Sequence, residues 1–185
     1  MMAYIPLLLA AAVVAWFVAA YNKLVRLRNQ VKNAWHQIEV QLKRRYDLIP
    51  NLVEVVKDYM SYEQETLTKV IEARGAALSA RGAAAQAKAE NVLTESLKSL
   101  FAVVENYPEL KSAENVTALQ AEIARLEDVI ADRRELYNDQ VFRYNTRIQQ
   151  LPANLLAAIA GWRPEPFFTA GDDERERPAV DLRSD

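Results

Sequence analysis

Residues 119–151 read LQAEIARLEDVIADRRELYNDQVFRYNTRIQQL, and they carry the clearest helical pattern in the chain. Apolar or aromatic residues recur at gaps of three and four, which places them on one face of an α-helix. The spacing is close to a heptad repeat and stops at Pro152, because proline does not continue a helix. The pattern therefore predicts one long helix. The positions on its apolar face are Leu119, Ile123, Leu126, Ile130, Arg133, Tyr137, Val141, Tyr144, Ile148 and Leu151.

Three further segments show the same spacing and predict further helices. They cover residues 24–46, 48–78 and 92–104. The alanine-rich stretch 75–90 has weak periodicity and is left open as helix or loop. Ser112 is expected to cap the long helix, and a short apolar piece at 154–160 is expected to stop at Gly161.

The fold class follows from what these segments share. No segment alternates polar and apolar residues over a useful length, so a sheet is not expected. Long helices joined by short connections pack in antiparallel pairs. The sequence therefore predicts an all-α fold, an elongated antiparallel bundle of about four long helices. Its near-heptad faces would also suit a dimer, so homo-oligomerisation is left open.

The N-terminal segment is uncharged from Met1 to Tyr21. In a helix it would span about 30 Å, close to the thickness of a hydrocarbon core. A cleaved signal peptide is the rival interpretation, but no basic residue precedes the apolar stretch, so a retained anchor is favoured. We expect a transmembrane anchor at 1–22 that continues into a bundle at 23–162. A polar tail at 163–185 is expected to be disordered or loosely docked, through Phe167 and Phe168 if it docks.

Four cations follow the anchor closely, namely Lys23, Arg26, Arg28 and Lys32. Positive charge beside a membrane span marks the cytoplasmic side. This predicts a single-pass protein of the cell membrane, with its N-terminus outside and its bundle in the cytoplasm. The same residues could instead attract anionic headgroups of the bilayer.

Residues 41–53, QLKRRYDLIPNLV, place cations, an acid and a proline between two apolar segments. We expect a corner here, with Arg44 and Arg45 in the last turn of one helix. Asp47 would cap the next helix, and Pro50 would lie near its start. Together with Asn51, these residues are candidates for an interaction or for fixing helix register.

Two Tyr-Asn pairs, Tyr137-Asn138 and Tyr144-Asn145, lie seven residues apart on the long helix. Seven residues make two turns, so both pairs present the same face. They could form a buried polar network that fixes register, or a polar groove for a peptide or small ligand.

The sequence contains few patterns that are typical of catalytic, metal-binding or phosphate-binding sites. The chain has one histidine, His36, and no cysteine, so neither a histidine-rich metal site nor a cysteine nucleophile can be assembled. No glycine-rich phosphate loop occurs. The net charge of −2, with cations concentrated near the N-terminus, does not fit a nucleic-acid-binding domain. We expect a protein that is not an enzyme and that has no cofactor and no bound metal.

Six ordered blocks resemble the LemA family: YNKLVRLRNQVKNAW, IEVQLKRRYDLIPNLVEVVKDY, ETLTKVIEARGAA, ENYPELKSAENVTALQ, RRELYNDQVFRYNTRIQQLPANLLA and FFTA followed by ERPAVDL. The resemblance implies a membrane helix followed by a helical bundle, without a well-established activity. Some relatives are encoded near membrane metalloproteases, and one branch participates in magnetosome formation. Tyr46 stands where many relatives have a histidine.

Three functions remain open at this point. The preferred one is a non-enzymatic scaffold or adaptor with a protein partner of unknown identity. The second is a membrane organiser that binds anionic lipid. The third is a regulator of a membrane protease that acts through Arg45, Asp47 and Asn51.

Overall fold

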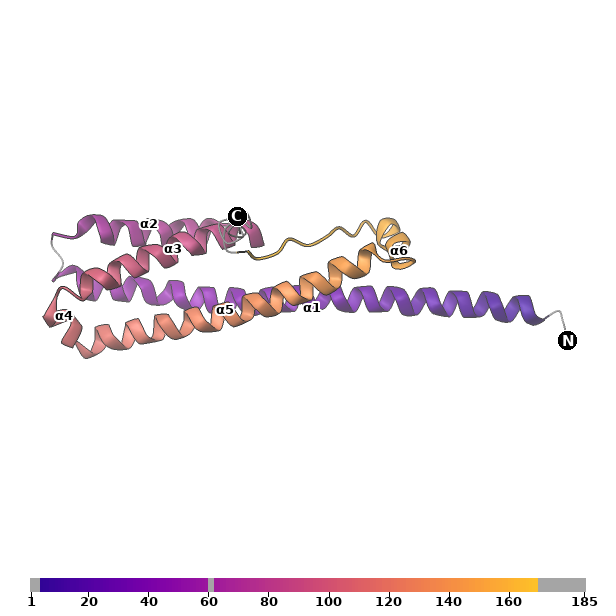
Figure 1. The fold of residues 1–185 in the computed structure, drawn as a ribbon, viewed down its shortest axis with the longest axis horizontal. Coiled ribbons are helices and arrows are strands. Elements are labelled where there is room, and N and C mark those ends of the chain that lie inside the picture. The colour runs from indigo at the N-terminus through magenta and orange to yellow at the C-terminus, as the bar shows by residue number, and fades with distance from the viewer. Residues whose placement is uncertain (1–3, 60–61, 170–185) are drawn as a thin grey trace, which may run out of the picture. The chain divides into compact units, whose positions relative to one another are not determined.

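The computed structural model describes residues 4–59 and 62–169, and all regular secondary structure in these ranges is helical. Figure 1 shows the helices in chain order. The predicted all-α fold is confirmed. The helices are α1 (Ile5–Lys57), α2 (Gln64–Ser79), α3 (Ala83–Val104), α4 (Pro108–Ser112), α5 (Glu114–Gln149) and α6 (Ala153–Ile159).

The chain divides into two compact units, which are described separately. Unit 1 comprises Met1–Glu39 and Asp132–Pro166, and unit 2 comprises Val40–Ala131 and Phe167–Asp185. Both α1 and α5 contribute a segment to each unit. The tail from residue 170 onward lies outside the described residues.

In unit 1, α1 begins with an uncovered apolar run. Its large side chains are exposed as far as Val18, and Ala20 is the first buried residue in the described part of the helix. By length and composition α1 could cross a membrane, and the described ranges contain no other helix of that kind. Beyond Ala20 the predicted apolar face is buried at Leu24, Val31 and Ile38.

The segments of α1 and α5 in unit 1 are antiparallel. The rings of Trp35 and Tyr137 lie 5.4 Å apart, and those of Tyr21 and Trp162 lie 5.5 Å apart. Residues that come earlier in α1 thus meet residues that come later in the chain. This is the antiparallel packing that the long helices predicted.

In unit 2, α2 and α3 form a helical hairpin (Figure 1). The break between them is short, and Gly82 adopts a φ of 80°, which favours glycine. The open question about residues 75–90 is thereby answered, since they are helical on both sides of a break at 80–82. Alanines such as Ala77, Ala83 and Ala87 are buried because their small side chains let the two helices approach closely.

The predicted corner at residues 41–53 is wrong, since α1 continues to Lys57 with Pro50 inside it. Proline has no N–H to donate to the carbonyl four residues earlier, which belongs to Tyr46. That carbonyl instead accepts a hydrogen bond of 2.7 Å from Nε of Arg74 on α2. The side chain from the next helix replaces the missing bond, so the helix passes through the proline. Asp47 consequently lies within α1 and caps nothing.

Two smaller expectations about α5 are also wrong. Ser112 belongs to α4, where its hydroxyl donates to the carbonyl of Glu109 instead of capping α5. Arg133 and Leu151 are exposed, although the spacing placed them on the apolar face. Leu151 lies beyond the last residue of α5. Leu119 is half-buried, and the other predicted positions of that face are buried, with Ile123, Leu126 and Val141 fully so.

Candidate functional site

Unit 2 contains a buried polar cluster, formed by Arg45 and Tyr46 of α1 with Gln86, Glu90 and Thr94 of α3. The three residues of α3 are spaced by four, so they share one helix face. Arg45 and Glu90 are only 2% and 3% exposed. A charged pair of this kind requires partners for its polar atoms, because burial removes their water.

Hydrogen bonds link all five members. Arg45 donates to a carboxylate oxygen of Glu90 at 3.3 Å and to the hydroxyl of Thr94 at 2.9 Å. Tyr46 donates its hydroxyl to the other oxygen of Glu90. The amide of Gln86 donates to the Tyr46 oxygen at 2.8 Å. Glu90 therefore has an acceptor role toward both residues of α1.

The electrostatics of the cluster favour a neutral Tyr46. Burial raises the pKa of this phenol, and the adjacent Glu90 carboxylate raises it further because a second negative charge there would be repelled. The hydroxyl therefore stays a donor. The two terminal nitrogens of Arg45 are paired within the cluster, whereas its Nε is buried without a hydrogen-bond partner. The cluster thus joins α1 to α3 through Glu90 and Thr94.

On α5 in unit 1, the predicted Tyr-Asn face binds a segment of the chain itself. Tyr137 donates to the carbonyl of Pro166 at 2.9 Å, and Tyr144 to that of Arg163 at 3.3 Å. Asn145 both donates to the carbonyl of Glu165 and accepts from its backbone N–H, each at 2.9 Å. The polar groove is thus occupied by residues 163–166, which we call the C-terminal strap.

The phenols on this face are buried and neutral. Burial, followed by the negative charge of Glu165, raises the pKa of Tyr137 to about 12. Burial also raises the pKa of Tyr144. Both hydroxyls therefore act as donors to the strap. Beyond the strap, Phe168 is 1% exposed whereas Phe167 is 39% exposed, so one of the two phenylalanines is buried as the docking alternative expected.

The predicted site residues are only partly brought together. Arg45 joins the buried polar cluster, while Arg44, Asp47 and Asn51 are exposed on α1. Asn138 is half-buried on α5. Glu90 was not among the predicted site residues, although Gln86, Glu90 and Thr94 repeat every four residues in a largely alanine-rich stretch, and this spacing places them on one helix face.

The four cations after the apolar run of α1 differ in their surroundings. Lys23, Arg26 and Lys32 are exposed. Arg28 is half-buried, and its guanidinium carbon lies 5.8 Å from the ring centre of Trp162. Arg28 thus has a packing role that the other three lack.

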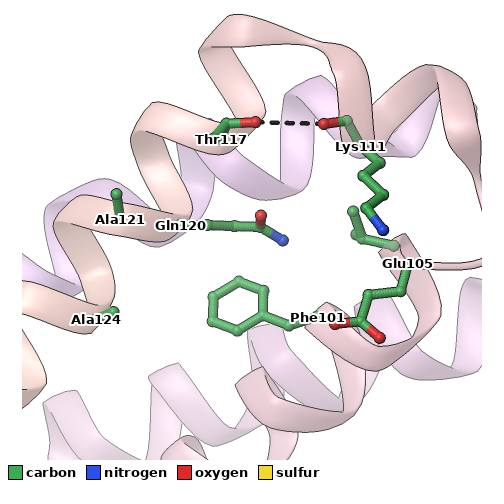
Figure 2. A pocket seen from close by; sticks show the side chains of 8 residues that line it. Phe101, Glu105, Lys111, Thr117, Gln120, Ala121 and Ala124 are labelled. Atoms are coloured by element: carbon green, nitrogen blue, oxygen red, sulfur yellow. Dashed lines mark hydrogen bonds between the residues drawn. The ribbon is translucent and has the colours of Figure 1, made fainter.

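Unit 2 also has a pocket of about 510 Å³ where α3, α4 and α5 meet (Figure 2). Figure 2 shows the Phe101 ring and the Gln120 amide pointing into the same space, with Glu105 and Lys111 on one side of it. The hydroxyl of Thr117 donates to the Lys111 carbonyl at 3.4 Å. An apolar ring bordered by both charge signs suits a partner's side chain.

In residues 4–59 and 62–169 no three His, Cys, Asp or Glu side chains are grouped so that they could hold a metal ion. His36 is exposed and bonds to Glu39 at 2.7 Å, three residues along the same helix.

Comparison with known proteins gives a consistent result. The model of the LemA family matches residues 34–182. The magnetosome protein MamQ 2 of Paramagnetospirillum magneticum is 27% identical over 96% of this chain and 72% of its own length. MamQ of Magnetospirillum gryphiswaldense is 24% identical over 98% and 74%. Protein LemA of Metamycoplasma hominis is 24% identical over 86% and 73%. None of these names denotes an enzyme.

Proposed function

The chain belongs to the LemA family, and we propose that it is a non-enzymatic, single-pass membrane protein whose helical units serve as a scaffold for a protein partner. The observation that carries the proposal is the continuity of α1. This helix begins with an uncovered apolar run and, without a break, supplies Arg45 and Tyr46 to the buried polar cluster. One continuous helix that runs from a candidate membrane span into a packed helical unit is consistent with a membrane-anchored scaffold.

The use of the polar residues supports a role without catalysis. The buried charges of Arg45 and Glu90 face each other, and Tyr137, Tyr144 and Asn145 hold the C-terminal strap. These are the groups whose environments depart most from water, and such groups are where catalysis is usually sought. Here these side chains form hydrogen bonds with other groups of the same chain.

We assign the partner surface to the pocket of Figure 2, because it combines an exposed apolar floor with charged groups at its edge. The names of relatives are also consistent with a structural role, since three of them are called magnetosome proteins. The partner of this chain is expected to present an apolar side chain next to a polar or charged one.

Site-specific photocrosslinking in native membranes tests the scaffold. A photoreactive residue at Gln120, which lines the pocket, should give a discrete adduct with another protein. The control places the same residue at Ala118, which is exposed and about half a turn away on α5. An adduct from Gln120 alone supports the proposal, and an adduct of the chain with itself would make the partner a second copy. Absence of any adduct, with the chain migrating alone on a native gel, would overturn it.

A further inference from the structure

The short helix α6 in unit 1 has one apolar face that no described part of the chain covers. On this helix Leu155 and Ile159 are spaced by four and are 55% and 85% exposed, and Leu151, which precedes Pro152 and the helix, is 75% exposed. Ala153 and Ala157 point the opposite way and are buried. The helix therefore packs through its small residues and presents its large ones outward, the reverse of an ordinary surface helix.

The composition around α6 is equally unusual. No charged residue occurs from Leu151 to Trp162, and arginines stand on both sides, at Arg147 and Arg163. The stretch therefore holds no charged side chain that would have to leave water on entering an apolar layer, and the arginines on either side could meet headgroups at its surface. Such a stretch is not typical of a face in contact with water alone.

The position of α6 is fixed by the residues that follow it. Gly161 has a φ of 66°, and the N–H of Trp162 bonds back to the carbonyl of Ala157 at 2.9 Å. This ending, common at helix C-termini, turns the chain so that Trp162 stacks on Tyr21, with Arg28 over its ring. The end of α6 is thereby held beside α1 near Ala20, where the uncovered apolar run finishes (Figure 1).

We infer that α6 is a second membrane contact, which lies in the interfacial layer of the bilayer at the level where α1 leaves it. The face of Leu155 and Ile159 enters the layer together with the exposed Leu151 that precedes the helix, and Tyr21 and Trp162 lie where aromatic residues concentrate at membrane surfaces. The lipid surface is the occupant because the uncovered apolar run of α1 ends beside α6, and because the flanking arginines match anionic headgroups. This inference rests on the proposed membrane anchoring by α1.

Single-cysteine labelling tests the inference, since the chain has no cysteine of its own. The full chain carrying Ile159→Cys is labelled with an environment-sensitive fluorophore. It is then reconstituted into vesicles of phosphatidylcholine and phosphatidylglycerol, with and without bromine on the acyl chains. Quenching by the brominated lipid should approach that of Val14→Cys in the apolar run. A label at Asn33→Cys, exposed on α1 beyond Tyr21, should keep its emission.

The pattern of quenching separates the outcomes. Quenching at both Val14 and Ile159 supports the inference. Quenching at Val14 alone overturns it while leaving the anchor in place, and no quenching at either position also overturns the anchoring on which it rests. If the labelled Ile159→Cys chain escapes quenching and the unlabelled variant forms disulfide-linked dimers when an oxidant is added, a second copy covers α6 and the membrane contact is wrong.

Discussion

The adjacent residues Arg44 and Arg45 of α1 have opposite surroundings, although the sequence pattern gave both the same predicted role. Arg44 is exposed, whereas Arg45 is buried against Glu90. The difference arises from the helical period, which rotates adjacent side chains by about 100°. Their substitution therefore separates the effect of a buried ion pair from the effect of positive charge.

We expect Arg45→Met to lower the free energy of unfolding by about 3–5 kcal/mol, because it leaves the Glu90 carboxylate buried without its cation. Arg44→Met is the matched control and should change stability by about 0.5 kcal/mol or less. Denaturant unfolding of the full chain in detergent, followed by circular dichroism, measures both. Equal effects of the two substitutions would contradict the assignment of Arg45 to the cluster.

The buried phenol of Tyr137 predicts a fall in stability at alkaline pH. Its pKa is about 10 when unfolded and about 12 in the structure, so the native state binds the proton more tightly. The stabilisation is fully present below pH 10 and is lost as the pH rises toward 12, at up to about 1.4 kcal/mol per pH unit. Thermal unfolding of the native chain and Tyr137→Phe across this window measures it.

The comparison with Tyr137→Phe isolates one titration from the others. At neutral pH the variant should be less stable by about 1 kcal/mol, since it lacks the hydrogen bond to Pro166. Between pH 10 and 12 the difference in stability should shrink to zero and then reverse, because only the native chain contains this ionising phenol and its loss of about 1.4 kcal/mol per pH unit exceeds the initial difference of about 1 kcal/mol. A constant gap would mean that the pKa of Tyr137 is not raised on folding.

At the scale of the helix, Pro50 of α1 and Arg74 of α2 act on the same backbone carbonyl. Pro50 has no N–H to donate to the carbonyl of Tyr46, and the guanidinium of Arg74 donates a hydrogen bond to it instead. We expect Arg74→Met to cost about 1–3 kcal/mol in the native background, since the carbonyl loses its partner. With Pro50→Ala present, the new N–H can serve that carbonyl, so Arg74→Met should cost less. Denaturant unfolding of the native chain, the two single variants and the double variant gives the coupling energy between residues 50 and 74.

The matched control for this double-mutant cycle is Arg81→Met. Arg81 donates to the nearby carbonyls of Leu78 and Ala80 and takes no part in the hydrogen bond between Arg74 and Tyr46. Its effect should be the same with and without Pro50→Ala. If Arg74→Met were also independent of residue 50, the link between the proline and α2 would be wrong.

Helices whose apolar period is uninterrupted could be predicted from the sequence. The face of α5 at Ile123, Leu126 and Val141 follows from spacing alone, and the stop at Gly161 follows from glycine's access to positive φ. The passage of α1 through Pro50 could not be predicted in this way, because it depends on Arg74, which reaches α1 from another helix.

The candidate site was predictable to a smaller extent for the same reason. Tyr137 and Tyr144 could be placed on one face, but their partners lie 29 and 19 residues away along the chain. Arg45 could not be matched to Glu90 across 45 residues without the fold. Spacing within a helix predicts faces, whereas pairing between distant residues depends on how the helices pack.

At the scale of the whole molecule, α1 joins the uncovered apolar run to both units. If α1 spans the membrane as proposed, the described residues beyond Lys23 lie on the side that receives Lys23, because they contain no other candidate span. The three exposed cations Lys23, Arg26 and Lys32 follow the apolar run within about ten residues, and such charges remain on the cytoplasmic side.

We therefore expect a reporter fused to the C-terminus to resist external protease in intact cells and to be cleaved once the cells are opened. Replacing Lys23, Arg26 and Lys32 by glutamine, with two lysines added after Met2, should expose the reporter on most chains. Arg28 is kept because it packs on Trp162. Lys43→Gln with Arg44→Gln is the control, since both cations are exposed but lie about 22 residues beyond Tyr21, too far to direct insertion. Cleavage of the unaltered chain from outside would reverse the proposed orientation and place the helical units on the other face of the membrane.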